Sequence, residues 1–210
     1  MTQNSDLFRG EDCKIAEAVC NEDLNYLESH LNESNINHLN EGGLTFINLA
    51  YLKNKKKSFK WLINHSADPN VPIYQNGSYL TFLLNLAIKD DSNFYYQLLI
   101  GKGDFELKDY KGLSPVHNAL RVSQFERALE LIDAGANINV VDSHHQTPVF
   151  YLCQIGNYEL AYKFLQRGAD IDIPDDGGIK IAFMISNDQL PIKSKAYFWQ
   201  QKILEEFIYH

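Results

Sequence analysis

The sequence predicts an all-α protein built as a solenoid of stacked helix–turn–helix repeats, and three observations support this. The segment 109–117 recurs as 142–150, and the segment 135–139 recurs as 168–172, so the chain repeats with a period of 33 residues. Residues that typically begin and end helices recur at the same 33-residue spacing. The segments between them carry one apolar stripe. A period of this size indicates a repeat array, in which each unit buries its apolar face against its neighbours.

Both clear copies contain the residues that begin a first helix and end a second one. A hydroxyl side chain can accept hydrogen bonds from the free amides of a first helical turn, and proline suits the first helical position. Glycine ends a helix in a left-handed conformation without steric cost. These residues are Ser114, Pro115 and Gly135 in one copy and Thr147, Pro148 and Gly168 in the next.

The second helix of each clear copy is expected to be amphipathic. Its apolar residues fall at positions i, i+3 and i+4, which places them on one helical face. They are Ala128, Leu131 and Ile132 in one copy and Ala161, Phe164 and Leu165 in the next.

Two degenerate copies precede the clear ones. Thr81–Ala87 takes the place of the motif start, and Thr45–Ala50 takes it one step earlier. The step between these two is three residues longer than the others. We place the insertion in Val71–Tyr79, where it lengthens one hairpin.

The ends of the chain depart from the pattern, as expected for solenoid caps that face water on one side. Ile15–Val19 and Leu24–Leu27 predict two short N-terminal helices, and Ser194–Tyr209 predicts a C-terminal helix that either seals the last repeat or binds a partner. We expect one domain with four internal repeats. Its segments are an N-terminal cap (1–38), repeats at 39–75, 76–108, 109–141 and 142–174, and a C-terminal cap (175–210).

The repeated motif resembles the ankyrin repeat. Asp109, Gly112, Ser114-Pro115 and His117 match Asp-x-x-Gly-x-Thr-Pro-Leu-His, and 135–139 matches the closing Gly-Ala-Asp-x-Asn. The resemblance implies β-hairpin loops between helix pairs, and a concave face of hairpin tips and first helices that binds proteins. It also implies a structural hydrogen-bonding role for His117.

Two residues depart from the family pattern at the turn glycine that Gly112 and Gly43 supply. His145 and Tyr79 stand there instead. If the turn requires a positive φ, His145 carries a strain cost of about 1 kcal/mol.

Bulk composition favours a globular protein that does not bind nucleic acid. Apolar residues make up 45% of the chain, and the formal charge of −8 lacks the basic face that phosphate binding needs. No signal peptide or transmembrane span is expected, so we expect no membrane partner. Three cysteines without a Cys-x-x-Cys motif favour a reducing, cytoplasmic setting.

No catalytic motif is present, and we expect no enzyme activity and no cofactor. His144 and His145, with Asp142 nearby and His117 in the preceding repeat, offer imidazole and carboxylate groups that a transition metal could use. Adjacent hairpin side chains point apart, however, and no metal-ligand motif accompanies them. A surface contact therefore fits His144 better than a metal site.

The predicted partner-binding residues lie on hairpins and first helices that the motif leaves free. They are Tyr74, Tyr79, Tyr110, Lys111, Leu113, Arg121, Ser143, His144, Gln146, Gln154, Asp175 and Asp176, with Ile88, Lys89, Val122 and Ile155 beside them. Tyrosine is enriched among residues that dominate binding energy. The lysine cluster at 53–60 is expected on the opposite edge and is a weaker candidate.

These features predict a protein–protein interaction module that is monomeric when free. The leading hypothesis is a cytoplasmic inhibitor or immunity-type protein that occludes a basic toxin or enzyme, because acidic complementarity speeds association. The alternatives are a bacterial effector or adaptor that binds host proteins, and a metal-dependent enzyme hidden in the degenerate caps.

Overall fold

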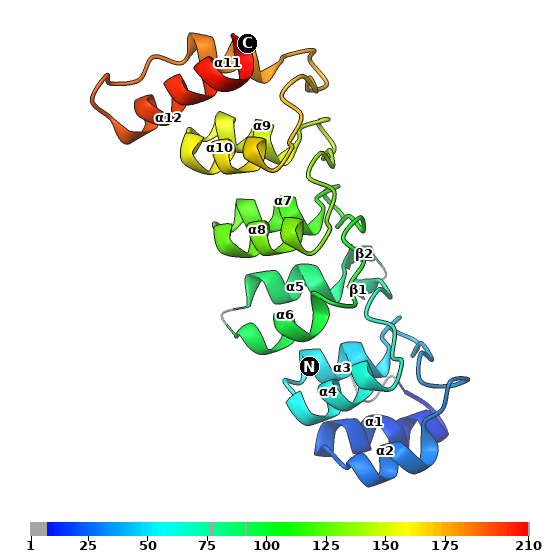
Figure 1. The fold of residues 1–210 in the computed structure, drawn as a ribbon. Helices are drawn as coiled ribbons and strands as arrows, with labels where there is room; N and C mark the ends of the chain where they lie inside the picture. Colours follow the sequence, from blue (N-terminus) through cyan, green and yellow to red (C-terminus); the bar gives the residue numbers. More distant parts are fainter. Residues whose placement is uncertain (1–7, 76–77, 91, 210) are drawn as a thin grey trace. The chain divides into compact units, whose positions relative to one another are not determined.

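The computed structural model describes residues 8–75, 78–90 and 92–209, and the chain divides between Tyr110 and Lys111 into two compact units (Figure 1). The described part of each is mostly helical, with helices arranged in antiparallel pairs. The predicted all-α helix–turn–helix architecture is therefore confirmed.

The described residues of the first unit form three helix pairs and one β-hairpin. Its helices are α1 (Glu11–Asn21), α2 (Leu24–His30), α3 (Phe46–Leu52), α4 (Lys56–Asn64), α5 (Leu83–Lys89) and α6 (Asn93–Leu99), and its antiparallel strands are β1 (Ile73–Gln75) and β2 (Ser78–Thr81). Phe46, Phe59 and Leu83 are completely buried between successive pairs. The hairpin overlaps the predicted insertion at 71–79 and continues two residues beyond it, to Thr81.

The second unit contains three further pairs, and its last helix continues as a short π-helix. The elements are α7 (Pro115–Arg121), α8 (Phe125–Asp133), α9 (Pro148–Gln154), α10 (Tyr158–Gln166), α11 (Ile181–Asn187), α12 (Lys195–Ile203) and the π-helix Leu204–Ile208. Apolar residues of both helices in each pair are buried, including Val116, Leu131 and Phe164.

The predicted helix boundaries of the clear repeats are confirmed by their hydrogen bonds. Ser114 Oγ accepts from the amide of His117 at 3.4 Å, and Thr147 Oγ1 accepts from the amide of Phe150 at 3.2 Å. Gly168 has a φ of 92°, which only glycine adopts without steric cost.

The third copy begins its first helix differently. Thr81 remains in β2, where it pairs with Ile73, and α5 begins only at Leu83 after Phe82. Phe82 replaces the proline that would start the helix one residue earlier. Thr81 is consequently buried, and its hydroxyl has no hydrogen-bond partner among the described residues.

The C-terminal helix α12 seals the last repeat. Ser194 caps it by accepting from the amide of Tyr197 at 3.0 Å. Gln200 is buried and donates to the carbonyl oxygens of Ile185 and Asp188 at 2.9 and 2.8 Å. Of the two roles considered for this helix, the structure shows the packing role.

Two asparagines at the same repeat position differ in how well they are satisfied. Asn118 Nδ2 donates to the carbonyl oxygens of Leu113 and Ser114 at 3.3 and 3.4 Å. Asn85, its equivalent in the preceding copy, is fully buried, and neither side-chain polar atom has a partner among the described residues. The equivalent residue in the copy before is Leu49, which is also fully buried. An apolar side chain therefore suits this position where no acceptor is available.

We predict that Asn85→Leu raises the free energy of unfolding by about 1 kcal/mol, because it removes two buried polar atoms that lack partners. Thermal unfolding followed by circular dichroism measures this effect. Asn118→Leu is the matched control and should lower the melting temperature, because it removes the side-chain hydrogen bonds to the carbonyl oxygens of Leu113 and Ser114. A lower melting temperature for Asn85→Leu would contradict the explanation.

Candidate functional site

A cluster of tyrosines lies on the hairpin edge of the first unit. Tyr74 is 41% exposed and Tyr110 is 58% exposed. The rings of Tyr74 and Tyr79 meet edge to face across the β1–β2 pair, with centroids 6.2 Å apart. The Tyr110 amide donates to the carbonyl oxygen of Leu80 at 3.2 Å, which places Tyr110 beside β2. Three of the predicted contact residues are thus gathered at one edge.

Tyr79 has a different role from its two neighbours. Its ring is half-buried against Phe82, and its hydroxyl donates to the carbonyl oxygen of Lys108. Burial, followed by the nearby Asp109 carboxylate, raises the pKa of Tyr79 to about 12, so the hydroxyl remains a donor at neutral pH. Tyr79 lies in a strand and does not take the left-handed conformation of a turn glycine. Tyr79 therefore stabilises the hairpin through its hydrogen bond to Lys108, and its ring is only half-exposed.

Tyr74 is held by its fit over a glycine. Gly43 has a φ of 75°, and a Cβ added there would lie 3.2 Å from Cδ2 of Tyr74. Any other residue at position 43 would be strained and would press against the ring. The exposed part of Tyr74 is therefore presented on a defined backbone.

The hairpins of the second unit are internally hydrogen-bonded. Asp142 is buried, and its Oδ1 accepts from the amides of His144 and Gln146 at 2.8 and 3.0 Å. Ser143 Oγ donates to the carbonyl oxygen of Lys111 at 3.2 Å, which links two successive hairpins. These bonds keep the side chains of Lys111, Ser143 and His144 exposed on a fixed backbone.

The final hairpin continues this arrangement. The Asp176 amide donates to the carbonyl oxygen of His144 at 3.0 Å, and the two side chains lie 3.6 Å apart. Asp175 is turned into its own loop, where its Oδ1 accepts from the amides of Gly177 and Ile179. Asp176 is exposed, whereas the carboxylate of Asp175 shapes the turn.

Residues at the ends of the first helices form the second part of this surface. Val122 is 38% exposed and Ile155, at the same repeat position, is 46% exposed. Arg121 donates to Asp142 at 3.3 Å, and its guanidinium carbon lies 5.1 Å from the ring centroid of Tyr151. Gln154 is exposed next to Ile155. The hairpin edge of the second unit thus combines apolar, cationic and acidic side chains.

Two of the expected surface residues are buried. Leu113 is buried at the base of its hairpin, and Ile88 is fully buried on α5. Leu113 directly precedes the buried capping residue Ser114, so it packs with the helix start rather than pointing to solvent. The repeat motif does not specify a residue type at either position. A position without a specified residue type can still be buried.

His117 joins two successive repeats, which confirms its structural role. Its Nε2 lies 3.0 Å from the carbonyl oxygen of Gln146 and donates to it. Its Nδ1 then accepts from the Ser114 hydroxyl at 2.9 Å. Both polar atoms of this buried imidazole are engaged.

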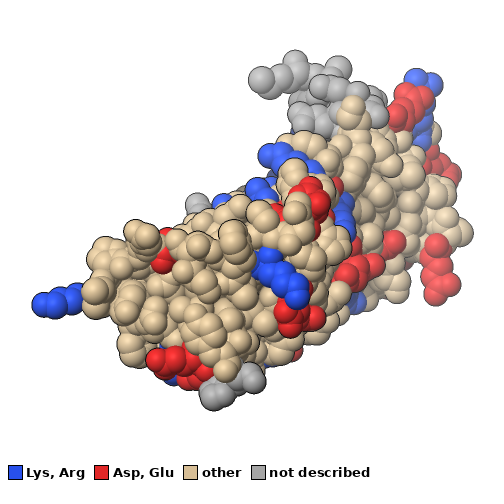
Figure 2. All heavy atoms as spheres, turned by 90° about the horizontal axis from the view of Figure 1, so that it is seen from above, with Lys and Arg blue, Asp and Glu red and all other residues tan. Residues whose placement is uncertain are grey.

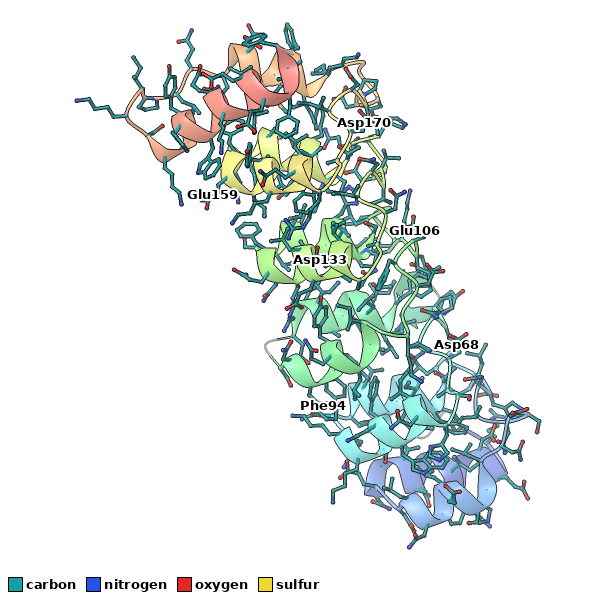
Figure 3. The ribbon with its side chains drawn as sticks, viewed as in Figure 1. Asp68, Phe94, Glu106, Asp133, Glu159 and Asp170 are labelled. Atoms are coloured by element: carbon teal, nitrogen blue, oxygen red, sulfur yellow. The ribbon has the colours of Figure 1, made fainter. Side chains whose placement is uncertain are left out.

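Acidic side chains line the loops that follow the second helices, and Figure 3 shows this in each unit. In the first unit, Asp68 and Glu106 lie on the loop side, and Phe94 lies on the opposite side. In the second unit, Asp170 lies on the loop side and Glu159 on the opposite side. Among these labelled residues, acidic side chains thus lie on the loop side of the first unit and on both sides of the second.

The lysine cluster lies away from the hairpins of the first unit. Lys53 and Lys55 stand in the turn before α4, and Lys56, Lys57 and Lys60 are part of α4 itself. Lys56 Nζ lies 5.3 Å from the ring centroid of Phe94. The cluster therefore extends beyond the turn in which the sequence placed it.

Apolar side chains are exposed on the C-terminal cap of the second unit. Figure 2 views the end on which α11 and α12 lie, and uncharged side chains cover most of it. The exposed apolar residues of the cap are Ile179, Phe183, Ile192, Phe198 and Tyr209. Apolar surface of this kind is available for contact with another molecule.

The two adjacent histidines have separate partners. His144 faces the Asp176 carboxylate, whereas His145 Nδ1 lies 2.8 Å from the carbonyl oxygen of Pro174. Within the described ranges, no three His, Cys, Asp or Glu side chains are grouped so that they could hold a metal ion.

The cysteines are free thiols and lie in different environments. Cys153 is buried in α9, and burial raises its pKa well above the usual range. Burial also raises the pKa of Cys20. In the part of the chain that the structure describes, none of the helices has the length and apolar character needed to cross a membrane.

Comparison with known proteins agrees with this geometry. Residues 83–175 match the family model of ankyrin repeats in three copies. The fold is similar to the crystal structure of an ankyrin-repeat domain from Acinetobacter baumannii, with a TM-score of 0.67 and 20% identity over 92% of this chain and 97% of that one. It is also similar to the ankyrin-repeat domain of Bcl-3, a member of the IkappaB family, with a TM-score of 0.63 and 21% identity over 81% of this chain and 78% of that one.

A short sequence match also links this chain to a curated protein. The potassium channel SKOR of Arabidopsis thaliana is 35% identical over 69 residues, which are 33% of this chain and 8% of the channel. The chain thus matches only a small part of that protein.

Residues 83–175 thus match ankyrin repeats, and the chain has the fold of ankyrin-repeat domains. Domains of this class are generally protein–protein interaction modules and are typically non-catalytic. No enzyme family was detected.

The left-handed His145 provides a test of turn strain. Its φ is 55°, whereas the equivalent turn residues Gly112 and Gly178 have φ values of 74° and 77°. We predict that His145→Gly is about 1 kcal/mol more stable than His145→Ala, because both lose the bond to Pro174 but only alanine retains the strain. Equal melting temperatures would show that the turn tolerates a side chain at no cost.

Proposed function

We propose that this protein binds a partner protein through its hairpin edges. The main support for this proposal is the exposure of Tyr74 and Tyr110, which are 41% and 58% exposed. The Tyr74 ring packs over Gly43, and the Tyr110 amide is hydrogen-bonded to Leu80, so both residues have a fixed backbone position. A tyrosine whose backbone is already ordered loses little conformational entropy on binding, so it contributes strongly to affinity.

The hairpin edge of the second unit is a second proposed contact surface. Lys111, Ser143, His144 and Asp176 present polar groups, while Arg121 and Gln154 flank the exposed Val122 and Ile155. A mixture of apolar and polar side chains is typical of protein–protein interfaces. Gln146, Asp175, Leu113 and Tyr79 shape or support the hairpins that carry these residues.

The partner that fits best is a basic toxin or enzyme, which the protein would neutralise in the cytoplasm by occluding its surface. The formal charge of −8, with Asp170 and Asp176 exposed on the loops, supports a basic partner. An acidic surface speeds encounter with such a partner. A bacterial effector or adaptor would bind its host protein through the same edges. The identity of the captured partner distinguishes this function from that of an inhibitor.

We predict that Tyr110→Ala/His144→Ala weakens partner binding by roughly 1 to 2 kcal/mol while the melting temperature remains unchanged, because both side chains are exposed. Tagged protein captures the partner from native lysate, and calorimetry with the purified partner measures the affinity. The control is Tyr209→Ala/His38→Ala, which also removes one exposed tyrosine and one histidine. His38 lies 3.4 Å from the carboxylate of Asp12, much as His144 lies 3.6 Å from that of Asp176.

Loss of affinity in the first variant but not in the control would support the hairpin edges. Equal affinity for both variants and the wild type would place the binding surface elsewhere.

We also predict that the association rate constant falls about tenfold between low and high salt, because the attraction of a basic partner is screened. Stopped-flow fluorescence measures the rate. Asp170→Asn/Asp176→Asn keeps the side-chain shape and should flatten the salt dependence. A salt-independent rate for the wild type would argue against a basic partner.

A further inference from the structure

The first unit contains a groove that the proposed binding surface does not use. It lies between the C-terminal ends of α2 and α4 and has a volume of about 340 Å³. This is at the small end of the range for ligand sites. Its lining side chains include Glu28, Leu31, Glu33, Ile36, Trp61 and His65.

An aromatic pair forms one wall of the groove. The rings of Trp61 and His65 are stacked with centroids 3.9 Å apart and an angle of 12° between their planes. His65 Nδ1 donates to the carbonyl oxygen of Trp61 at 2.7 Å, which fixes the imidazole on the helix end. The indole is therefore held in a defined position, and it is only half-buried.

The groove is apolar at its base and acidic at its rim. Ile36 is buried and Leu31 is half-buried, whereas Glu28 and Glu33 are exposed. Glu28 lies 3.6 Å from His65 Nε2. The described lining residues include two carboxylates but no lysine or arginine. A cationic group would thus find negative charge and an aromatic ring together.

We propose that this groove binds an arginine side chain of a partner protein. The apolar stem of arginine can lie along Leu31, Ile36 and the indole. Its planar guanidinium stacks on aromatic rings and pairs with carboxylates through a fork of donors, which the compact ammonium of lysine cannot do as well. The two carboxylates at the rim complement this charge.

This site is independent of the hairpin edges, so its test does not depend on the partner captured there. The chain has only two tryptophans, Trp61 and Trp199, and Trp199 belongs to α12 in the second unit. The two indole N–H signals in a proton–nitrogen NMR spectrum therefore report the groove and an internal reference separately.

The experiment titrates the full chain with N-acetyl-argininamide, and with N-acetyl-citrullinamide as a neutral analogue of the same shape. We expect the Trp61 indole signal to shift with the arginine compound only, while Trp199 stays in place. Glu28→Gln/Glu33→Gln should weaken binding roughly three- to tenfold, because each exposed carboxylate contributes modestly.

The matched control is Glu11→Gln/Glu17→Gln, which removes the same charge from exposed positions on α1 and should leave binding unchanged. A Trp61 shift of equal size with the citrulline compound, or unchanged binding in Glu28→Gln/Glu33→Gln, would overturn the site. Equally tight binding of N-acetyl-lysinamide would overturn its assignment to arginine.

Discussion

The burial of each repeat's apolar stripe by its neighbour is the interaction on which the structure depends. A single helix pair cannot cover Leu131 or Phe164 by itself, and both side chains are completely buried only because another pair packs over them. Hydrogen bonds then set the register of this packing. His117 joins the cap of its own helix to the carbonyl oxygen of Gln146 at the start of the next repeat. Stacking and register are therefore coupled through a few buried polar groups.

The degenerate repeats show the consequences of losing those polar groups. Asn48 stands at the position of His117, and both of its side-chain polar atoms are buried without partners in the described structure. Thr81 is in the same situation because β2 extends through it and delays the helix. Buried polar atoms of this kind are destabilising. The inserted hairpin thus extends the surface at the expense of local hydrogen bonding.

The proposed contact surfaces use the parts of each repeat that stacking leaves free. Hairpin tips and first-helix ends project beyond the buried stripe, so Tyr110 or Ile155 can remain exposed without weakening the core. The groove beside Trp61 arises differently, from the loop that follows α2 and lies against the end of α4. The mixed surface thus lies on the hairpins and first-helix ends, whereas the acidic groove with its aromatic wall lies at the ends of two second helices.

Local patterns in the sequence predicted the fold and much of the hairpin edge. The capping roles of Ser114 and Thr147, the glycine helix ends, the inserted hairpin and the left-handed His145 follow from short-range backbone chemistry, which neighbouring residues determine. The repeat register predicted the exposed positions of Tyr110 and His144, and the inserted hairpin predicted that of Tyr74.

Only the tertiary structure decided which variable residues are buried and which distant side chains meet. Leu113 is buried, and the Tyr79 hydroxyl donates to the carbonyl oxygen of Lys108. Trp61 and Glu28 come from different helix pairs and line the same groove. The repeat pattern reports backbone position but not the local spacing between helices. That spacing depends on the combined volumes of side chains from several repeats, which no single motif contains.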